Sequence, residues 1–376
     1  MKFAFLTNQP SYYQMHFARA MVKELGEQNF RIVFYKDTTA DRKEMGWIDE
    51  YQERYIIRYA ATNTEKQRAH KWIEQADVVI QGRFPVNLIK HRIRAGKLTF
   101  AAQERLWKRP PTFLRKISRF PHLYKNYFSI DKPNYHFLSI GAHAAQDLLD
   151  LGVFEGRCWQ YGYFIDCPNS QPKVHRTHLK LLWCGRFCEF KQPIKAIEVL
   201  AALCNRGVPV RLTMVGDGEL REQAQAHSHA LGVHDLITFA GWQKQVDVYK
   251  AMSDADLFLM TSHQGEGWGL VVNEAMSHGC AVVADAALGS ATVLIEHAKT
   301  GLLYHDQKIK QVADQIADTP LSDIRAMGIN ARDNISLNWS ASVAANRTVE
   351  LSSLLLKGKI EEADCLFQDG VCCPVR

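Results

Sequence analysis

Short apolar runs alternate with amphipathic helical patterns along the chain, and this alternation restricts the possible folds more than any other feature. In the second half, five apolar runs are each bounded by polar residues or glycine: Leu179–Gly185, Arg211–Gly216, Leu236–Ala240, Leu257–Thr261 and Ala281–Ala284. Between the first two runs, residues 193–207 place apolar side chains on one helical face, with a proline near the start and a glycine at the end. Strands that alternate with helices predict a parallel sheet with helices on both faces.

The first half repeats this pattern with less regular spacing. Its predicted helix is Tyr12–Gly26, and its strand candidates are Lys2–Thr7, Arg31–Tyr35, Val78–Gln81, Leu98–Ala101 and Phe137–Ile140. A chain of 376 residues suits two such domains better than one. The pattern is interrupted within 163–176 by Pro168, Asn169, Ser170 and Pro172, which places the boundary between domains there.

We therefore expect an α/β protein with two Rossmann-like, doubly wound domains. The first domain is predicted at 1–165 and the second at 166–335. Residues 336–376 would form a C-terminal helix and tail. The helix, predicted over Trp339–Leu356, is expected to pack back on the first domain, whereas 357–376 shows no periodicity.

Composition excludes several classes of protein. With 47% hydrophobic and 23% charged residues, the chain resembles an average soluble protein rather than a disordered or fibrous one. No apolar run approaches the roughly 18–20 residues that a membrane span needs. The apolar run at the start is too short for the core of a signal peptide and is more typical of a buried strand. We expect a cytoplasmic protein.

The nine cysteines fit that location, because their number is odd and no C-x-x-C pair occurs. Cys184 and Cys280 lie in apolar runs and are expected to be small buried hydrophobic residues. Cys184 and Cys188 could form half of a zinc site, but no second pair of ligands accompanies them.

A basic, aromatic stretch covers residues 83–128. It holds one acid, Glu104, and twelve cations: Arg83, Lys90, Arg92, Arg94, Lys97, Arg105, Lys108, Arg109, Arg115, Lys116, Arg119 and Lys125. The interleaved aromatic residues are Trp107, Phe113, Phe120, Tyr124, Tyr127 and Phe128. Such a surface suits binding to an anionic membrane, here the inner face of the cytoplasmic membrane. A solvated basic face is an equal alternative, and nucleic acid is not expected because no nucleic-acid-binding motif is present.

Chemistry-bearing residues follow three of the predicted strands. Arg186 and Lys191 come after Gly185, and the turn Gly216-Asp217-Gly218 ends the next strand. After the strand 257–261 come Glu266, Gly267, Trp268, Gly269 and Leu270, and then Glu274, about two helical turns beyond Glu266. Two cations, close-approach glycines and a helix N-terminus at the carboxyl ends of parallel strands predict a site for a diphosphate-linked ligand. Without the other two motifs, Glu266 would be read as an acid at the start of a helix and Glu274 as a surface residue.

The ordered motifs Gly-Arg-Phe…Lys, Val-Gly-Asp-Gly, Glu-Gly-Trp-Gly…Glu-Ala-Met and Thr-Gly-Leu-Leu resemble glycosyltransferase family 4 over residues 180–304. That family retains the anomeric configuration and has the GT-B fold, so the resemblance implies two Rossmann-like domains that face each other across a cleft. The resemblance implies that Arg186 and Lys191 hold the donor diphosphate and that Glu266 contacts sugar hydroxyls. It implies that the amides of 267–269 lie beside the sugar and phosphates, that Glu274 binds the ribose, and that the turn at 216–218 lines the nucleotide.

The resemblance is weaker in the first domain. The start Asn8-Gln9-Pro10-Ser11-Tyr12-Tyr13 is similar to a branch of the family common in polysaccharide and lipopolysaccharide assembly, but the usual glycine pair is missing. The expected residues on the acceptor side are Ser11, Tyr12, Tyr13, Glu104 and Arg105. A second departure is Val293, which stands where the family often has glutamate.

The implied reaction transfers a hexose from a nucleotide-diphosphate sugar to a hydroxyl of a glycan or lipid-linked acceptor, with retention. No cofactor or catalytic metal is expected, because Asp254-Ala255-Asp256 resembles a metal motif of another fold but precedes a buried strand. One alternative is a scaffold subunit that binds the donor without turnover. Another is a nicotinamide-dependent oxidoreductase, against which the first strand is followed by no G-x-G-x-x-G.

Overall fold

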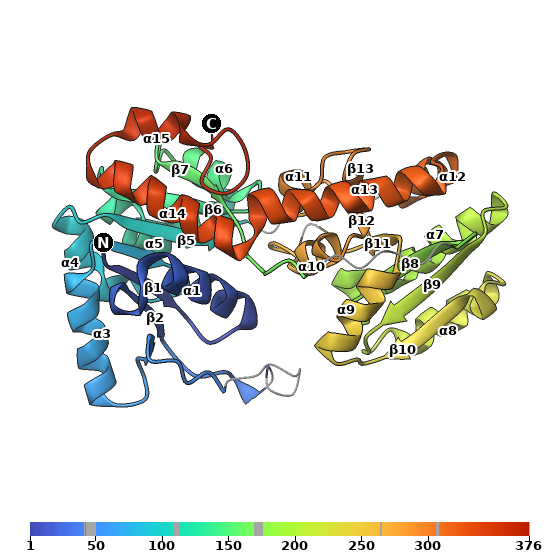
Figure 1. Ribbon diagram of the computed structural model, residues 1–376, viewed down its shortest axis with the longest axis horizontal. Coiled ribbons are helices and arrows are strands. Elements are labelled where there is room, and N and C mark those ends of the chain that lie inside the picture. Colours follow the sequence, from blue (N-terminus) through green and yellow to red (C-terminus); the bar gives the residue numbers. More distant parts are fainter. Residues whose placement is uncertain are drawn as a thin grey trace. The chain divides into compact units, whose positions relative to one another are not determined.

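Two compact units make up the chain (Figure 1). The first comprises Met1–Asp166 together with Asn338–Arg376, and the second is Cys167–Leu337. The computed structural model describes residues 1–40, 42, 50–107, 113–168, 176–263, 265–305 and 308–375. The segment 169–175, where the sequence places the domain boundary, lies outside these residues, as do Lys108, Arg109 and Gln264.

In the described part of the first unit, a parallel sheet runs in the order β3-β2-β1-β4-β5-β6-β7. The strands are β1 (Phe3–Thr7), β2 (Phe30–Phe34), β3 (Ile56–Arg58), β4 (Val78–Gln81), β5 (Thr99–Glu104), β6 (Tyr135–Ile140) and β7 (Cys158–Tyr161). The strand order reverses between β1 and β4, and the carboxyl ends of strands at such a switch point are where open α/β sheets bind ligands.

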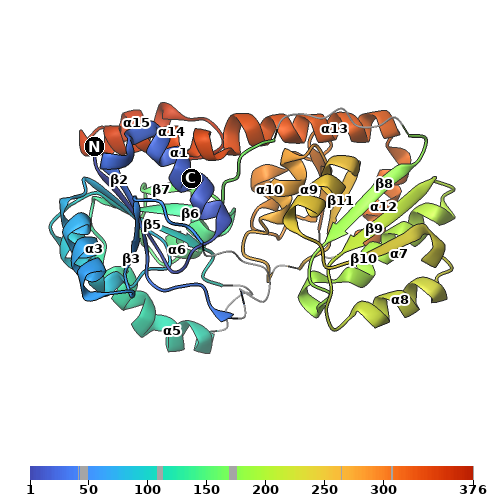
Figure 2. The same ribbon diagram turned by 60° about the horizontal axis from the view of Figure 1, so that its bottom comes forward.

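The helices of the first unit are α1 (Tyr12–Leu25), α3 (Asn63–Gln75), α4 (Lys90–Arg94), α5 (Phe113–Asn126), α6 (Ala144–Leu149), α14 (Ala341–Leu356) and α15 (Ile360–Leu366). Helix α14 packs alongside α1, as both views show (Figures 1 and 2). Beyond α15 the tail returns to β7, where the Cys372 amide donates to the Gln160 carbonyl and the Gln160 amide to the Cys373 carbonyl, both at 2.8 Å. These bonds pair the outer edge of β7.

The second unit contains a parallel sheet in the order β10-β9-β8-β11-β12-β13 within its described residues. Its strands are β8 (Leu179–Cys184), β9 (Val210–Val215), β10 (Ile237–Gly241), β11 (Leu257–Met260), β12 (Ala281–Asp285) and β13 (Gly301–Tyr304). Its helices are α7 (Pro193–Asn205), α8 (Arg221–Ala230), α9 (Gln245–Asp254), α10 (Val271–Ser277), α11 (Ala291–Leu294), α12 (Ile309–Asp318) and α13 (Leu321–Asn334). The switch point here lies between β8 and β11.

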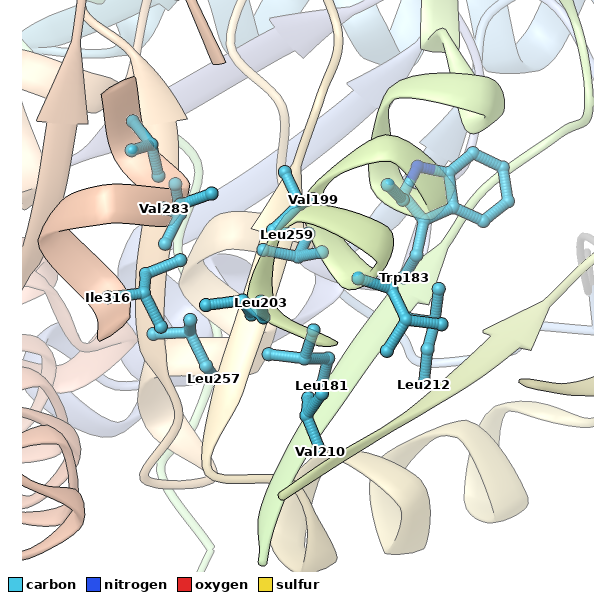
Figure 3. Packing of buried hydrophobic residues seen from close by; sticks show 14 of the residues in the cluster. Leu181, Trp183, Val199, Leu203, Val210, Leu212, Leu257, Leu259, Val283 and Ile316 are labelled. Atoms are coloured by element: carbon cyan, nitrogen blue, oxygen red, sulfur yellow. The ribbon is translucent and has the colours of Figure 1, made fainter. Parts of the chain in front are cut away.

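The core that packs against this second sheet is apolar. Val199 and Leu203 of α7 pack on Leu181, Leu257 and neighbouring strand residues, all of them buried (Figure 3). Burying each such side chain contributes roughly 1.5–3 kcal/mol. The loops that leave the strands are thereby carried by a rigid sheet.

The ten strands predicted from sequence are all present, with ends that differ by at most three residues, and the predicted doubly wound α/β class is confirmed. The sequence analysis did not predict the strands β3, β7 and β13. Each has only three or four residues, too short for periodicity to register. In the described residues, no helix combines the length and apolar character needed to cross a bilayer.

The sequence predicted that the cations of residues 83–128 form a surface, and this is wrong for Arg92. Arg92 is 1% exposed, and its guanidinium donates to the carbonyls of Ile73, Ala76, Asp77 and Leu98 at 2.6–2.9 Å. Burial lowers the pKa of Arg92 to about 10. The side chain ties α3, α4 and β5 together, so it adds no charge to a surface. Trp107 and Tyr127 are also buried, at 4% and 2% exposure.

We predict that acid destabilises the first unit through His136. This side chain is 2% exposed and its Nδ1 accepts from Trp159 Nε1 at 3.2 Å, while burial lowers its pKa from 6.5 to about 3. The unfolded chain therefore takes up a proton below about pH 6.5 that the folded chain does not, and the free energy of unfolding falls as pH drops toward 3. Urea titrations across this range should show a smaller loss for His136→Gln. An equal loss in His136→Gln and in the exposed control His91→Gln would contradict the assignment.

Candidate functional site

The loops that follow β8 and β11 meet at the switch point of the second sheet. The Lys191 ammonium forms an ion pair with the Glu266 carboxylate, and the two side chains are only 18% and 17% exposed. Because Lys191 ends the turn after β8 and Glu266 lies in the loop after β11, this contact joins segments 75 residues apart in sequence. The sequence predicted both residues at strand ends, and the structure brings them together.

Lys191 is held in place through its backbone. The Thr261 hydroxyl donates to the Lys191 carbonyl at 2.7 Å and accepts from the Trp183 indole N–H at 2.9 Å. The His263 amide also donates to the Phe190 carbonyl at 3.2 Å. These bonds cross from the β8 loop to the end of β11, so the position of the ammonium is set by the sheet and not by a free loop.

Glu274 lies in α10 and is 8% exposed. Its Oε1 accepts from the Tyr249 hydroxyl at 3.0 Å, and the Tyr249 ring stacks on His278 with centroids 4.6 Å apart. Burial, with the nearby Glu274 charge, raises the pKa of Tyr249, so the phenol stays a donor. Burial likewise raises the pKa of the neighbouring Cys184 thiol to about 12. Glu274 is therefore a carboxylate oriented by a neutral hydroxyl.

The turn after β9 touches the start of the loop after β8. Gly216 has φ +126°, and a Cβ there would lie 1.9 Å from the Gly185 carbonyl oxygen. Gly218 has φ +149°, and its Cβ would lie 2.6 Å from the Phe187 carbonyl oxygen. Only glycine allows this φ and this approach. The two loops consequently form one backbone surface at the switch point.

Two of the predicted charged residues have partners of their own. Asp217 accepts from the Gly218 amide and from the Arg221 guanidinium, each at 2.8 Å, so its carboxylate closes the turn. The Arg186 side chain is 57% exposed, and its guanidinium nitrogen lies 3.7 Å from the Glu219 carboxylate. An exposed contact of this length is weak, which leaves Arg186 able to reorient.

The segment 267–270 is held in position by buried contacts. Trp268 is 1% exposed and its indole N–H donates to Asn273 Oδ1 at 2.7 Å. A Cβ on Gly289 would lie 1.8 Å from the Gly267 carbonyl oxygen, so the chain after β12 passes directly against this segment. Gly269 has φ +86°, and Leu270 caps α10. Trp268 thus contributes backbone to the site, while its ring is a core residue.

The Asp254-Ala255-Asp256 motif lies at the amino end of β11, the opposite edge of the sheet from Lys191. Asp254 pairs with Arg176 and Lys180. Asp256, 1% exposed, accepts from Arg325 Nε and from the Lys180 amide, both at 3.0 Å. These acids hold the start of β8, α9 and α13 together. In the parts of the chain that the structure describes, no three His, Cys, Asp or Glu side chains gather as a metal site requires.

In the first unit, three of the five expected acceptor-side residues gather around Tyr163. The rings of Tyr13 and Tyr163 lie 4.5 Å apart, and the Tyr163 hydroxyl donates to Glu104 Oε1 at 2.7 Å. Burial raises the pKa of both tyrosines. Ser11, buried at the N-cap of α1, lies against Tyr13. Tyr12 instead meets His16 edge-on at 6.3 Å. Arg105 interacts electrostatically with Asp147.

Sequence reasoning missed a hollow of about 460 Å³ in the first unit. It lies at the carboxyl ends of β1, β2, β4 and β5, against α5, and is lined by Asn8, Tyr35, Lys36, Gln81, Gly82, Arg83, Phe84, Pro85, Val86, Gln103, His122, Asn126 and Tyr127. Asn8, Lys36 and Arg83 each come one or two residues after a strand. A polar residue directly after a strand is the same signal that predicted the site in the second unit, and it could have identified these three residues.

Comparison with known proteins finds a family match within the second unit. The family model described as Glycosyl transferases group 1 matches residues 169–332. A GDP-mannose-dependent alpha-(1-6)-phosphatidylinositol monomannoside mannosyltransferase of Mycobacterium tuberculosis is 30% identical over 151 residues, 38% of this chain and 39% of the relative. The putative colanic acid biosynthesis glycosyltransferase WcaL of Escherichia coli is 27% identical over 202 residues, 51% of this chain and 49% of the relative. The matched part of the chain thus spans less than half the length of either relative.

Among solved structures, HepE of Anabaena in complex with UDP aligns with a TM-score of 0.66 at 16% identity, over 94% of this chain and all of that one. This likeness shows the fold, which is GT-B. It agrees with the two doubly wound sheets and with the family resemblance of the ordered motifs. The chain therefore has the GT-B fold, and its residues 169–332 match the family model of the group 1 glycosyl transferases.

Proposed function

We propose that this chain is a retaining glycosyltransferase that moves a hexose from a nucleotide-diphosphate sugar to a hydroxyl of a glycan or lipid-linked acceptor. The observation that carries the proposal is the meeting of Lys191, Glu266 and the Gly185–Gly216 backbone at one switch point. The cation can bind the diphosphate, the carboxylate can accept from sugar hydroxyls, and the closely packed backbone lets a sugar diphosphate approach.

Each residue has a proposed role in the transfer. Departure of the diphosphate builds negative charge, which Lys191 and a reoriented Arg186 stabilise, with the amides of 267–269 beside them. Glu266 accepts from sugar hydroxyls, and Glu274 accepts from the ribose. The acceptor oxygen attacks the anomeric carbon on the face that the diphosphate leaves. The acceptor proton passes to the departing phosphate oxygen, which leaves the configuration retained without a carboxylate nucleophile.

The relatives support this class of reaction. One is named as GDP-mannose-dependent, one as acting in colanic acid biosynthesis, and HepE was crystallised with UDP. We propose cell-surface polysaccharide assembly as the setting. We also propose that transfer needs no metal, because the two cations supply the charge that a divalent ion would otherwise supply.

A panel of UDP-, GDP- and dTDP-sugars tests the proposal, scored for binding and for hydrolysis or transfer with and without EDTA. We expect one donor to be turned over and the rate to survive EDTA. Tight donor binding without turnover would favour a scaffold subunit, and hydride transfer with a nicotinamide would favour an oxidoreductase.

We predict that Glu274→Gln weakens binding of the matching nucleoside diphosphate by about tenfold or more. A carboxylate that accepts from a ribose hydroxyl makes a charge-assisted bond worth roughly 1.5–3 kcal/mol, and the amide loses that charge. Isothermal titration measures the effect. Glu296→Gln, an exposed residue paired with Lys299, is the matched control. Equal affinities for the two variants would remove Glu274 from the nucleotide site.

We further propose that α5 places the protein on the inner face of the cytoplasmic membrane. Phe120 and Tyr124 are 55% and 54% exposed, and their rings lie 6.1 Å apart on this helix. Lys125 and Arg119 are exposed beside them. Exposed rings next to cations suit an anionic lipid surface, where each cation contributes about 1 kcal/mol.

The double variant Phe120→Ser/Tyr124→Ser should bind anionic vesicles about tenfold more weakly, because two rings no longer enter the interface. Co-sedimentation with phosphatidylglycerol vesicles at low salt measures this. Trp242→Ser, which removes a ring of 59% exposure from the second unit, is the control. Failure of the unmodified protein to bind such vesicles would end the membrane proposal.

A further inference from the structure

The hollow of the first unit lies at the switch point of its own sheet. Asn8 follows β1, Gly82 and Arg83 follow β4, and Lys36 follows β2, so its rim consists of strand ends. Its volume of about 460 Å³ falls in the range of small-molecule sites. None of the motifs that predicted the donor site falls within it.

The charge of the hollow is entirely positive. Among its described lining residues there is no Asp or Glu, whereas Lys36 and Arg83 both line it. Neither cation forms an ion pair with any residue that the structure describes. The acid next to Lys36 in sequence, Asp37, accepts instead from Arg58 at 3.0 Å. Two unneutralised cations on one concave surface attract an anion.

The neutral polar groups in the hollow also present donors. Gln103 Oε1 accepts from the Tyr127 hydroxyl at 2.9 Å, so the amide oxygen is engaged and the NH₂ group of this lining residue is a donor. His122 Nδ1 lies 3.1 Å from the Asn126 amide nitrogen, which can only donate, so the neutral imidazole carries its hydrogen on Nε2. Together with Lys36 and Arg83, the Gln103 and His122 side chains make four groups that can donate a hydrogen bond to a ligand oxygen.

An aromatic wall completes the hollow. Tyr35 is 37% exposed and stacks on Tyr59 with centroids 5.5 Å apart, while Phe84 meets the Tyr35 ring edge-on at 5.5 Å. The packing of Tyr59 and Phe84 fixes the Tyr35 ring in position. A rigid, half-exposed ring beside hydrogen-bond donors suits the apolar face of a sugar ring.

We infer that this hollow binds an acidic sugar of the acceptor, with its phosphate or carboxylate between Lys36 and Arg83 and its ring against Tyr35. The inference rests on the proposed transferase function, since it names the substrate class that the first unit receives. An acceptor with a charged sugar is thereby preferred over its neutral counterpart.

Saturation-transfer NMR and calorimetry on the full chain test this with glucose 6-phosphate, glucuronate and glucose as probes. We expect one or both anionic sugars to bind at least tenfold more tightly than glucose, because a charge-assisted bond is lost in the neutral sugar. The tighter of the two identifies the anionic group. Raising the salt concentration should weaken the binding.

Lys36→Gln and Arg83→Gln should each weaken binding of the preferred anionic sugar by about tenfold. Lys71→Gln, which removes an exposed cation of α3 outside the hollow, should not change it. Nucleoside diphosphate binding to the second unit, measured on the same samples, should be equal in all three variants. That readout separates the fate of this inference from that of the donor site.

Two outcomes would overturn the inference. One is glucose binding as tightly as both anionic sugars, and the other is Lys36→Gln and Arg83→Gln behaving like Lys71→Gln. Tyr35→Ala provides a second check, because loss of the ring should weaken binding of anionic and neutral sugars alike while the preference for the anionic sugar persists.

Discussion

Replacing Lys191 by alanine is expected to lower kcat/KM for the donor sugar by about 10²–10³-fold, the usual effect of removing one preorganised group that stabilises developing negative charge. The ammonium is only 18% exposed and its backbone is fixed by Thr261, so no reorganisation is needed when the diphosphate leaves. An exposed, mobile cation could not contribute as much, because water would screen it. Steady-state kinetics with the donor identified from the panel measure the effect.

The control must separate chemistry from stability. Lys191→Ala leaves the Glu266 carboxylate, 17% exposed, without its partner, and an unpaired buried charge is itself costly. The double variant Lys191→Ala/Glu266→Gln removes that cost and should recover the melting temperature but not the rate. Lys250→Ala, which takes away an exposed cation paired with Asp247, should leave both unchanged. If Lys191→Ala retained more than a tenth of the rate, the charge-stabilising role would be lost.

Most of the fold could be predicted because its strands bury both faces. Runs such as Leu257–Met260 and Ala281–Asp285 are wholly buried and read as continuous apolar stretches. The edge strand β3 and the tail pairing with β7 could not be predicted. Ile56–Arg58 is too short to show a period, and residues 372–375 pair through backbone groups, which leave no side-chain pattern.

The sequence also indicated which loops form the site but not how their side chains are used. Trp268 was expected in the donor site through its backbone amide, and Asp217 as part of the turn that lines the nucleotide. The sequence did not indicate that the Asp217 carboxylate binds Gly218 and Arg221, or that the Trp268 ring is buried in the core. Arg92 was counted with the surface cations because charge alone cannot tell an exposed guanidinium from one that donates to four buried carbonyls. These distinctions depend on contacts distant in sequence.

The second large effect is expected for Gly216→Ala, which should lower the free energy of unfolding by about 3 kcal/mol or more and sharply weaken nucleoside diphosphate binding. A Cβ at this position would lie 1.9 Å from the Gly185 carbonyl oxygen, and φ +126° is strained for alanine. Relief requires the loops after β8 and β9 to separate. That movement would displace the backbone on which Arg186 and Lys191 depend. Urea denaturation and calorimetric titration of the donor nucleotide measure the two effects.

Gly207→Ala is the matched control, since Gly207 also has positive φ, +73°, but a Cβ there has nothing within 4 Å. Its cost should be limited to the conformational strain of about 1–2 kcal/mol, with nucleotide affinity unchanged. The difference between the two variants then isolates the steric contact from the backbone strain. If both glycines cost the same and both variants bound the nucleotide equally well, the close approach of the two loops would have no part in shaping the donor site. A loss of affinity confined to Gly216→Ala would show that the backbone contact between the loops after β8 and β9, and not only the charged side chains, holds the site in its binding geometry.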